Sequence, residues 1–203
     1  MTNFDYLKDC EGVKHLYELC CEVECRQTSD PGTSALYARN VLDWIVQAIY
    51  RLEDIGDANG KSLFQLMNDD KFVRYINDAS MMQTLHYIRK IGNIGAHNPS
   101  SVKRNESYFV LRQLHGAVGA VLMKFGLISS FPDFDDNLIP KKPRLRVAPT
   151  ATAKSVSDEV QTVKATPKQG SLNKSQYKTV FTEDETRKLF IDIMLKEAGW
   201  DIL

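Results

Sequence analysis

Apolar residues recur three or four positions apart through most of the first 128 residues, which is the spacing of an amphipathic helix. The pattern predicts a first helix from Glu11 to about Gln27. It predicts a longer second helix that begins after Asp30, a suitable N-cap, with Pro31 at its first position, and that ends near Asp54. The apolar positions on which these two helices depend are Val13, Leu16, Cys20, Val23, Val41, Trp44, Ile45, Ala48 and Leu52.

The same spacing predicts short helices over "SLFQLMND" and "KFVRYIND", then a helix capped by Ser80 that carries Met81, Leu85 and Ile88. A last amphipathic helix is expected from Glu106 to about Phe125. No segment before Gly126 alternates apolar and polar residues as a strand would. Residues 1–128 are therefore expected to fold as an all-α bundle of four long helices with short additional helices.

The composition changes from about Ser129. Residues 140–178 are rich in Pro, Ser, Thr and Lys and contain a single aromatic residue, Tyr177, so we interpret residues 129–181 as a linker. Thr182 and Glu185 then have the spacing of a capping box and predict another helix. Its apolar stripe has no partner in the chain unless the helix docks back on the bundle, and we expect residues 182–203 to be the truncated start of a second domain.

Charge is unevenly distributed along the chain. Residues 1–140 carry 14 Lys+Arg against 18 Asp+Glu, residues 141–180 carry 9 against 2, and residues 181–203 carry 3 against 6. The basic middle segment could bind nucleic acid through phosphates, an interaction that weakens as salt concentration rises. The alternative is a solvated spacer. The candidate nucleic-acid-binding residues are Lys141, Lys142, Arg144 and Arg146.

The N-terminus and the four cysteines narrow the class of protein. No apolar run approaches the roughly 20 residues that span a bilayer, and the first ten residues contain acids rather than a signal sequence. We expect a cytoplasmic protein. The cysteines cluster near the N-terminus without a second pair of metal ligands, which favours reduced thiols on a helix face over a zinc site. They are Cys10, Cys20, Cys21 and Cys25.

The stretch "YIRKIGNIGAH" carries the candidate chemistry of the bundle. Arg89, Asn93 and His97 are four residues apart, so a continuous helix would place them along one side over two turns. Such a row could bind a phosphate, and a histidine can also exchange a proton during RNA cleavage. The alternative is structural: Asn93 and His97 secure a helix end whose glycines permit close packing on a neighbouring helix.

Two stretches together resemble one protein family. "NFDYL" and "LHYIRKIGNIGAH" resemble the HEPN-like helical domain at the N-terminus of bacterial type I restriction enzyme R subunits. "FTEDETRKLFIDIMLKEAGWDIL" resembles the segment that opens the nuclease domain of those subunits. The resemblance implies a subunit that assembles with methyltransferase and specificity subunits, translocates DNA with ATP and cuts it with Mg²⁺.

The chain itself lacks the catalytic motifs that the resemblance implies. It contains neither a G-x-x-x-x-G-K-[ST] loop nor an Asp followed by Glu-x-Lys on consecutive strands. Among its residues, the resemblance makes Glu183 the better candidate for an early metal-binding carboxylate and Glu185 the second choice, because Glu185 already serves the capping box. No cofactor is therefore expected in this chain alone.

The candidate ribonuclease motif departs from the HEPN pattern. Asn93 and His97 match it, but Gly92 stands where the pattern has arginine, and Arg89 lies a full turn too early. We therefore expect a noncatalytic module that serves DNA or subunit contacts. The alternative is a self-contained HEPN-type ribonuclease or toxin.

Overall fold

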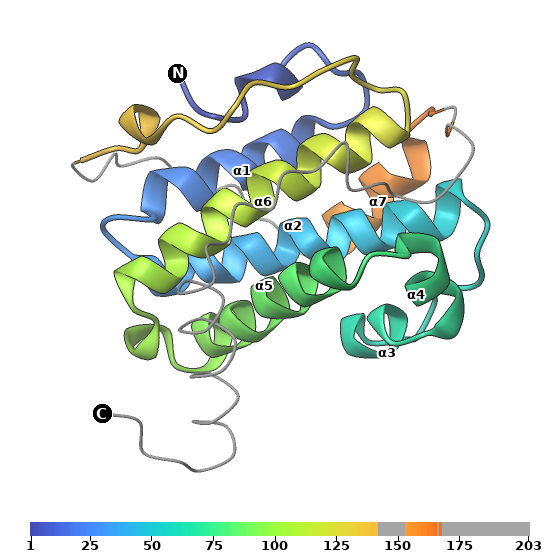
Figure 1. Cartoon of the computed structure of the whole chain (residues 1–203), viewed down its shortest axis with the longest axis horizontal. Helices are drawn as coiled ribbons and strands as arrows, with labels where there is room; N and C mark the ends of the chain where they lie inside the picture. Colours follow the sequence, from blue (N-terminus) through green and yellow to red (C-terminus); the bar gives the residue numbers. More distant parts are fainter. Residues whose placement is uncertain (142–152, 166, 168–203) are drawn as a thin grey trace.

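The protein is mainly helical. The computed structural model describes residues 1–141, 153–165 and 167, and no strand occurs among them (Figure 1). The prediction of an all-α bundle with four long helices is confirmed. The long helices are α1 (Lys14–Arg26), α2 (Pro31–Leu52), α5 (Ala79–His97) and α6 (Arg104–Lys124); the shorter elements are η1 (Asp5–Leu7), α3 (Leu63–Met67), α4 (Asp70–Ile76), η2 (Pro99–Ser101), η3 (Asp136–Leu138) and α7 (Ala153–Thr162).

Helix α2 lies at the centre of the fold and contacts α1, α5, α6 and α7. Its start is the predicted one. The side chain of Asp30 accepts a hydrogen bond from the Thr33 N–H at 3.1 Å, and Pro31 occupies the first turn, where its missing N–H is not needed. Most of its apolar side chains, including Trp44 and Ile45, are buried.

The start of α5 differs from the prediction. Asp78, not Ser80, is the N-cap: its carboxylate accepts from the Ser80 and Met81 N–H groups at 2.8 and 3.1 Å. Asp78 has an extended backbone, which is the N-cap conformation, whereas Ser80 is already inside the helix. A carboxylate at this position also complements the helix dipole, so it is favoured over the serine hydroxyl.

Residues 129–141, which we assigned to the linker, pack back onto the bundle beside the N-terminal segment (Figure 1). Asn3 holds the two together, because its side chain donates to the Asp135 carbonyl at 3.1 Å and accepts from the Asp135 N–H at 2.7 Å. The ring of Phe131 covers Gly119 so closely that a Cβ there would lie 2.5 Å from it. This part of the predicted linker therefore belongs to the bundle.

Helix α7 is a second departure from the linker prediction. The Glu159 carboxylate accepts from the backbone N–H groups of His15 and Leu16 at 2.6 and 3.0 Å, and from Trp44 Nε1 at 2.9 Å. Arg51 donates to the carbonyls of Val160 and Val163, the second at 3.0 Å, and both valine side chains are buried. One carboxylate thus joins α7 to the start of α1 and to the middle of α2.

Composition misses α7 because its attachment depends on particular side chains, Glu159 and the buried Val160 and Val163, rather than on the overall content of apolar residues. Residues 142–152, 166 and 168–203 lie outside the described residues, and so does the helix predicted from Thr182.

The four cysteines lie at the N-terminal end of the fold. All four cysteines are free thiols, three of them buried on α1 and Cys10 half-buried. Within the described residues, no group of three metal-ligating side chains comes together. None of the described helices is long and apolar enough to cross a membrane.

His115 is enclosed by aromatic rings where α6 meets the N-terminal segment and residues 129–141. The ring centroids of Phe4, Phe131 and Phe134 lie 5.4, 5.6 and 5.5 Å from that of His115, and the side chain is buried. Burial lowers the pKa of His115 to about 4, with partial opposition from a hydrogen bond to the Asn3 backbone and from Asp133. The imidazole is therefore neutral in the folded protein at neutral pH.

We predict that acid destabilises the fold through His115. Its pKa is lower in the folded state than in the unfolded chain, so the unfolded state binds more protons below about pH 6.5, and stability falls as pH drops toward 4. This residue should cost about 2 to 3 kcal/mol between neutral pH and roughly pH 4.5. Urea denaturation across this range should show that His115→Phe loses this part of the pH dependence. An unchanged dependence in His115→Phe would contradict the assignment.

The second prediction concerns the attachment of α7. Glu159→Ala removes the acceptor of three hydrogen bonds, so α7 should detach more often, and its amides should exchange with solvent at least about tenfold faster. Hydrogen exchange measured on the peptide that contains residues 158–165 tests this. Asp158→Ala is the matched control, since this neighbouring acid is exposed. Equal exchange in the two variants would contradict the role of Glu159.

Candidate functional site

The stretch Tyr87–His97 forms the second half of α5, and its glycines lie against α2. A Cβ at Gly92 would be 2.4 Å from the Cβ of Arg39 and 2.9 Å from the Ala35 carbonyl oxygen. A Cβ at Gly95 would be 2.4 Å from the carbonyl oxygen of Gly32. The two helices therefore approach as closely as they do because these side chains are missing, and the packing interpretation of the glycines is confirmed.

The three candidate residues do not gather into one compact group. The Arg89 guanidinium lies 4.9 Å from the centre of the Phe64 ring on α3, so it is directed along the surface toward that helix. Asn93 is half-buried, and His97 is exposed at the last position of α5. Since α5 rises about 1.5 Å per residue, Arg89 and His97 are about 12 Å apart along the axis.

These residues instead form part of a positively charged surface, which we call the α5 face: His86, Arg89, Lys90, Asn93 and His97. Burial lowers the pKa of His86, and the nearby charges of Arg89 and Lys90 lower it further. His86 is therefore neutral near pH 7, and the positive charge of the face comes from Arg89 and Lys90.

The distribution of charged residues along the sequence also indicates this surface. Between Asp78 and Glu106 there is no acidic residue, whereas Arg89, Lys90, Lys103 and Arg104 all fall in this interval. The surrounding bundle is acidic on balance, so α5 and the turn after it are the part of the bundle best suited to an anionic partner.

Arg39 of α2 is the residue that sequence reasoning missed. Its side chain packs on Gly92, and its Nε is buried without a hydrogen-bond partner among the described residues. One turn away, burial raises the pKa of Asp43, while a hydrogen bond from Gln47 at 3.0 Å and the charge of Arg39 partly lower it. The Cβ and Cγ atoms of an arginine from another helix thus pack on the position where the HEPN pattern has its own arginine.

The loop "GDANGKS" after α2 has some features of a phosphate-binding loop but not its geometry. Three residues separate Gly56 from Gly60, where a nucleotide-binding loop has four, and the loop follows a helix rather than a strand. The Ser62 hydroxyl accepts from the Gln65 N–H at 3.3 Å and caps the short helix α3. Lys61 lies 3.5 Å from Asp69. This loop therefore has neither the spacing nor the strand-to-helix context of a Walker-type phosphate-binding loop.

The remaining predicted site residues are mostly beyond the described part of the chain. Lys141 is exposed at the end of the segment that follows η3. The other predicted DNA-binding and metal-binding residues lie outside the described residues: Lys142, Arg144, Arg146, Glu183 and Glu185.

Comparison of the chain with protein-family models, curated proteins and solved structures found no match.

We predict that Gly92→Ala destabilises the protein by about 1 to 3 kcal/mol, the usual cost of overpacking. Helix propensity alone would give the opposite sign, a gain of about 1 kcal/mol. Thermal and urea unfolding measure the difference. Arg39→Gly in the same chain removes the Cβ that the new methyl group meets and should recover part of the loss. A stabilised Gly92→Ala protein would show that α5 and α2 are not in close contact here.

Proposed function

We propose that this chain is the N-terminal helical module of a type I restriction enzyme R subunit, noncatalytic in itself, and that its α5 face contacts DNA. The observation that carries the noncatalytic role is the packing of Gly92 on Arg39 and Ala35. The position that would supply a catalytic arginine is used for contact between helices, so the motif keeps Asn93 and His97 without an arginine of its own.

The charges of the α5 face support an anionic partner. Arg89 and Lys90 are half-buried on α5, and no acidic residue follows until Glu106. Cations on one helix face neutralise phosphates and displace counterions, which favours binding to DNA independently of its sequence. Exposed His97 and half-buried Asn93 add hydrogen-bonding groups to the same helix. Phosphate contacts of this kind position a protein on DNA and do not read its bases.

The resemblance to R subunits supports the identity of the larger assembly. The HEPN-like stretch and the stretch that resembles the start of the nuclease domain occur in the order in which they occur in those subunits. ATP and Mg²⁺ would serve the motor and nuclease parts of such a subunit, and DNA cleavage would take place there. The methyltransferase and specificity subunits would be its partners.

A ribonuclease is the second candidate function, and one observation favours it. Arg39 stands beside Gly92 and could supply from α2 the guanidinium that the motif lacks. In that case His97 would exchange the proton and Arg39 would stabilise the charge on the phosphate.

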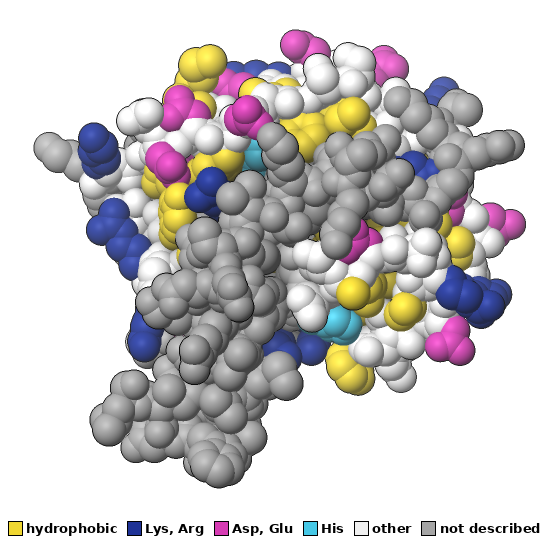
Figure 2. Space-filling model, in the orientation of Figure 1, with side chains coloured by type: hydrophobic (Ala, Val, Ile, Leu, Met, Phe, Trp, Pro, Cys, Tyr) yellow, Lys and Arg dark blue, Asp and Glu magenta, His cyan; other side chains and the backbone are white. Residues whose placement is uncertain are grey.

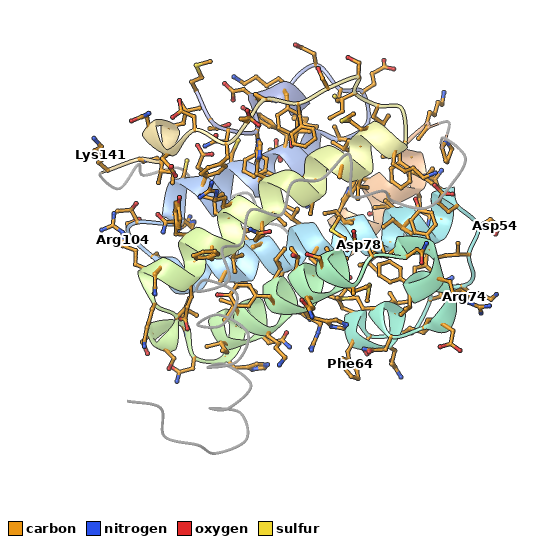
Figure 3. All side chains as sticks on the ribbon, viewed as in Figure 1. Asp54, Phe64, Arg74, Asp78, Arg104 and Lys141 are labelled. Atoms are coloured by element: carbon orange, nitrogen blue, oxygen red, sulfur yellow. The ribbon has the colours of Figure 1, made fainter. Side chains whose placement is uncertain are left out.

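Duplex DNA binding by the purified chain tests the proposal. Arg89→Ala and Lys90→Ala should each weaken binding by about threefold to tenfold, and the double variant should also reduce the dependence of affinity on salt. Fluorescence anisotropy measures both quantities. The matched control is Arg74→Ala, an exposed arginine on α4 that should leave affinity unchanged (Figure 3). Equal binding by all variants would contradict the role of the α5 face.

The same proteins distinguish the second candidate. Labelled single-stranded RNA at neutral pH should remain intact with the wild-type chain, and His97→Ala should alter stability by about 1 kcal/mol. Cleavage by the wild type that disappears in both His97→Ala and Arg39→Ala would establish the ribonuclease instead.

A further inference from the structure

A hollow of about 640 Å³ lies at the end of the bundle where the α1–α2 turn, the start of α6 and the segment after η3 meet. Lys and Arg side chains gather at this end of the molecule in Figure 2, and Figure 3 labels Arg104 and Lys141 there, opposite Arg74 and Asp54. The residues that line the hollow include Thr28, Arg104, Tyr108, Asp136, Ile139 and Lys141.

The wall of the hollow includes an aromatic ring that is held in place. Tyr108 is half-buried, and its ring meets those of Phe109 and Phe134 edge to face, with centroids 6.1 and 6.5 Å away. Its hydroxyl donates to Asp136 Oδ1 at 2.7 Å. Ile139 and Pro140 add apolar surface. A planar group could therefore lie on Tyr108 without the ring having to be ordered first.

Two cations lie at the rim of the hollow. Arg104 is the first residue of α6 and is exposed, and its contact with the Thr28 hydroxyl is long, at 3.5 Å. Lys141 is exposed on the facing segment. The start of the 21-residue helix α6 adds the positive end of its dipole on the same side. Together these groups favour a phosphate at the mouth of the hollow.

Asp136 restricts the kind of anion that fits. One of its oxygens accepts from Tyr108, and the other, which accepts no side-chain hydrogen bond from a described residue, can accept from a donor on the ligand. A simple inorganic anion would meet this carboxylate unfavourably and would leave most of the volume unused. A ligand that combines a phosphate with hydroxyl or amino donors and a planar ring satisfies all of these groups, and the volume lies within the range of small-molecule sites.

We propose that this hollow binds a nucleoside 5′-phosphate. The base lies on Tyr108 with Ile139 beside it, the phosphate contacts Arg104 and Lys141, and Asp136 accepts from the sugar or the base. The phosphate could belong to a free nucleotide or to the 5′ end of a strand. This site is separate from the α5 face and does not depend on the proposed function.

Isothermal titration of the full chain tests the site with adenosine 5′-monophosphate and adenosine, and with a short DNA strand bearing or lacking a 5′-phosphate. Phosphorylated probes should bind at least about tenfold more tightly than their unphosphorylated forms. Arg104→Ala and Tyr108→Leu should each weaken binding by about tenfold. Arg74→Ala is the matched control and should bind as the wild type does, and Arg89→Ala should do the same because it alters the α5 face alone.

Tighter binding of the phosphorylated strand than of the free nucleotide would identify a strand end as the ligand, and the reverse would identify a nucleotide. The proposal is overturned if the wild type binds none of the phosphorylated probes at millimolar concentration. It is also overturned if Arg104→Ala and Arg74→Ala reduce binding equally. If Tyr108→Leu unfolds, Tyr108→Phe keeps the ring and should retain binding within about threefold, and loss of binding there would refute stacking on this residue.

Discussion

Gly92 and Gly95 let α5 lie directly on the backbone and Cβ atoms of α2, and α2 in turn contacts the other long helices and α7. The closeness of these two helices fixes where the outer side of α5 faces. Lys90 lies on the side of α5 opposite Gly92, whereas Arg89, three residues before Gly92, lies at the flank of the contact with its Nε buried. The same contact brings Arg39 of α2 beside the candidate motif. The packing of α5 on α2 therefore explains both why position 92 carries no side chain and why Arg39 lies next to it.

The N-terminal segment, residues 129–141 and α7 are attached to this core by a few polar groups. Asn3 pairs with Asp135, and the Glu159 carboxylate receives donors from α1 and α2. A carboxylate that accepts three hydrogen bonds can hold a short helix on a bundle, and here it acts together with the buried Val160 and Val163. Both attachments join residues more than 100 positions apart in the chain, so neither follows from local sequence.

The sequence was most informative where structure follows from local pattern. Apolar spacing located the long helices, and Asp30 with Pro31 located the start of α2, because caps and helical periodicity depend on neighbouring residues. The linker prediction from composition was wrong for residues 129–141 and 153–165. Composition does not show that Phe131 packs on Gly119 or that N–H groups of α1 and α2 donate to Glu159. The site was predicted in part. The role of the glycines in close helix packing was predicted, but the contact of Arg39 with Gly92 was not, because only the fold brings these two residues together.

A substitution that restores the arginine of the HEPN pattern, Gly92→Arg, tests the central claim most directly. Position 92 faces Arg39 and Ala35 at a distance that admits no side chain. The variant should therefore unfold at a temperature lower by more than about 10 °C, and it should not cleave RNA. The measurement is thermal unfolding by circular dichroism, followed by incubation with labelled single-stranded RNA. A variant that unfolds at the wild-type temperature and cleaves RNA would show that α5 presents this position to a substrate rather than to α2.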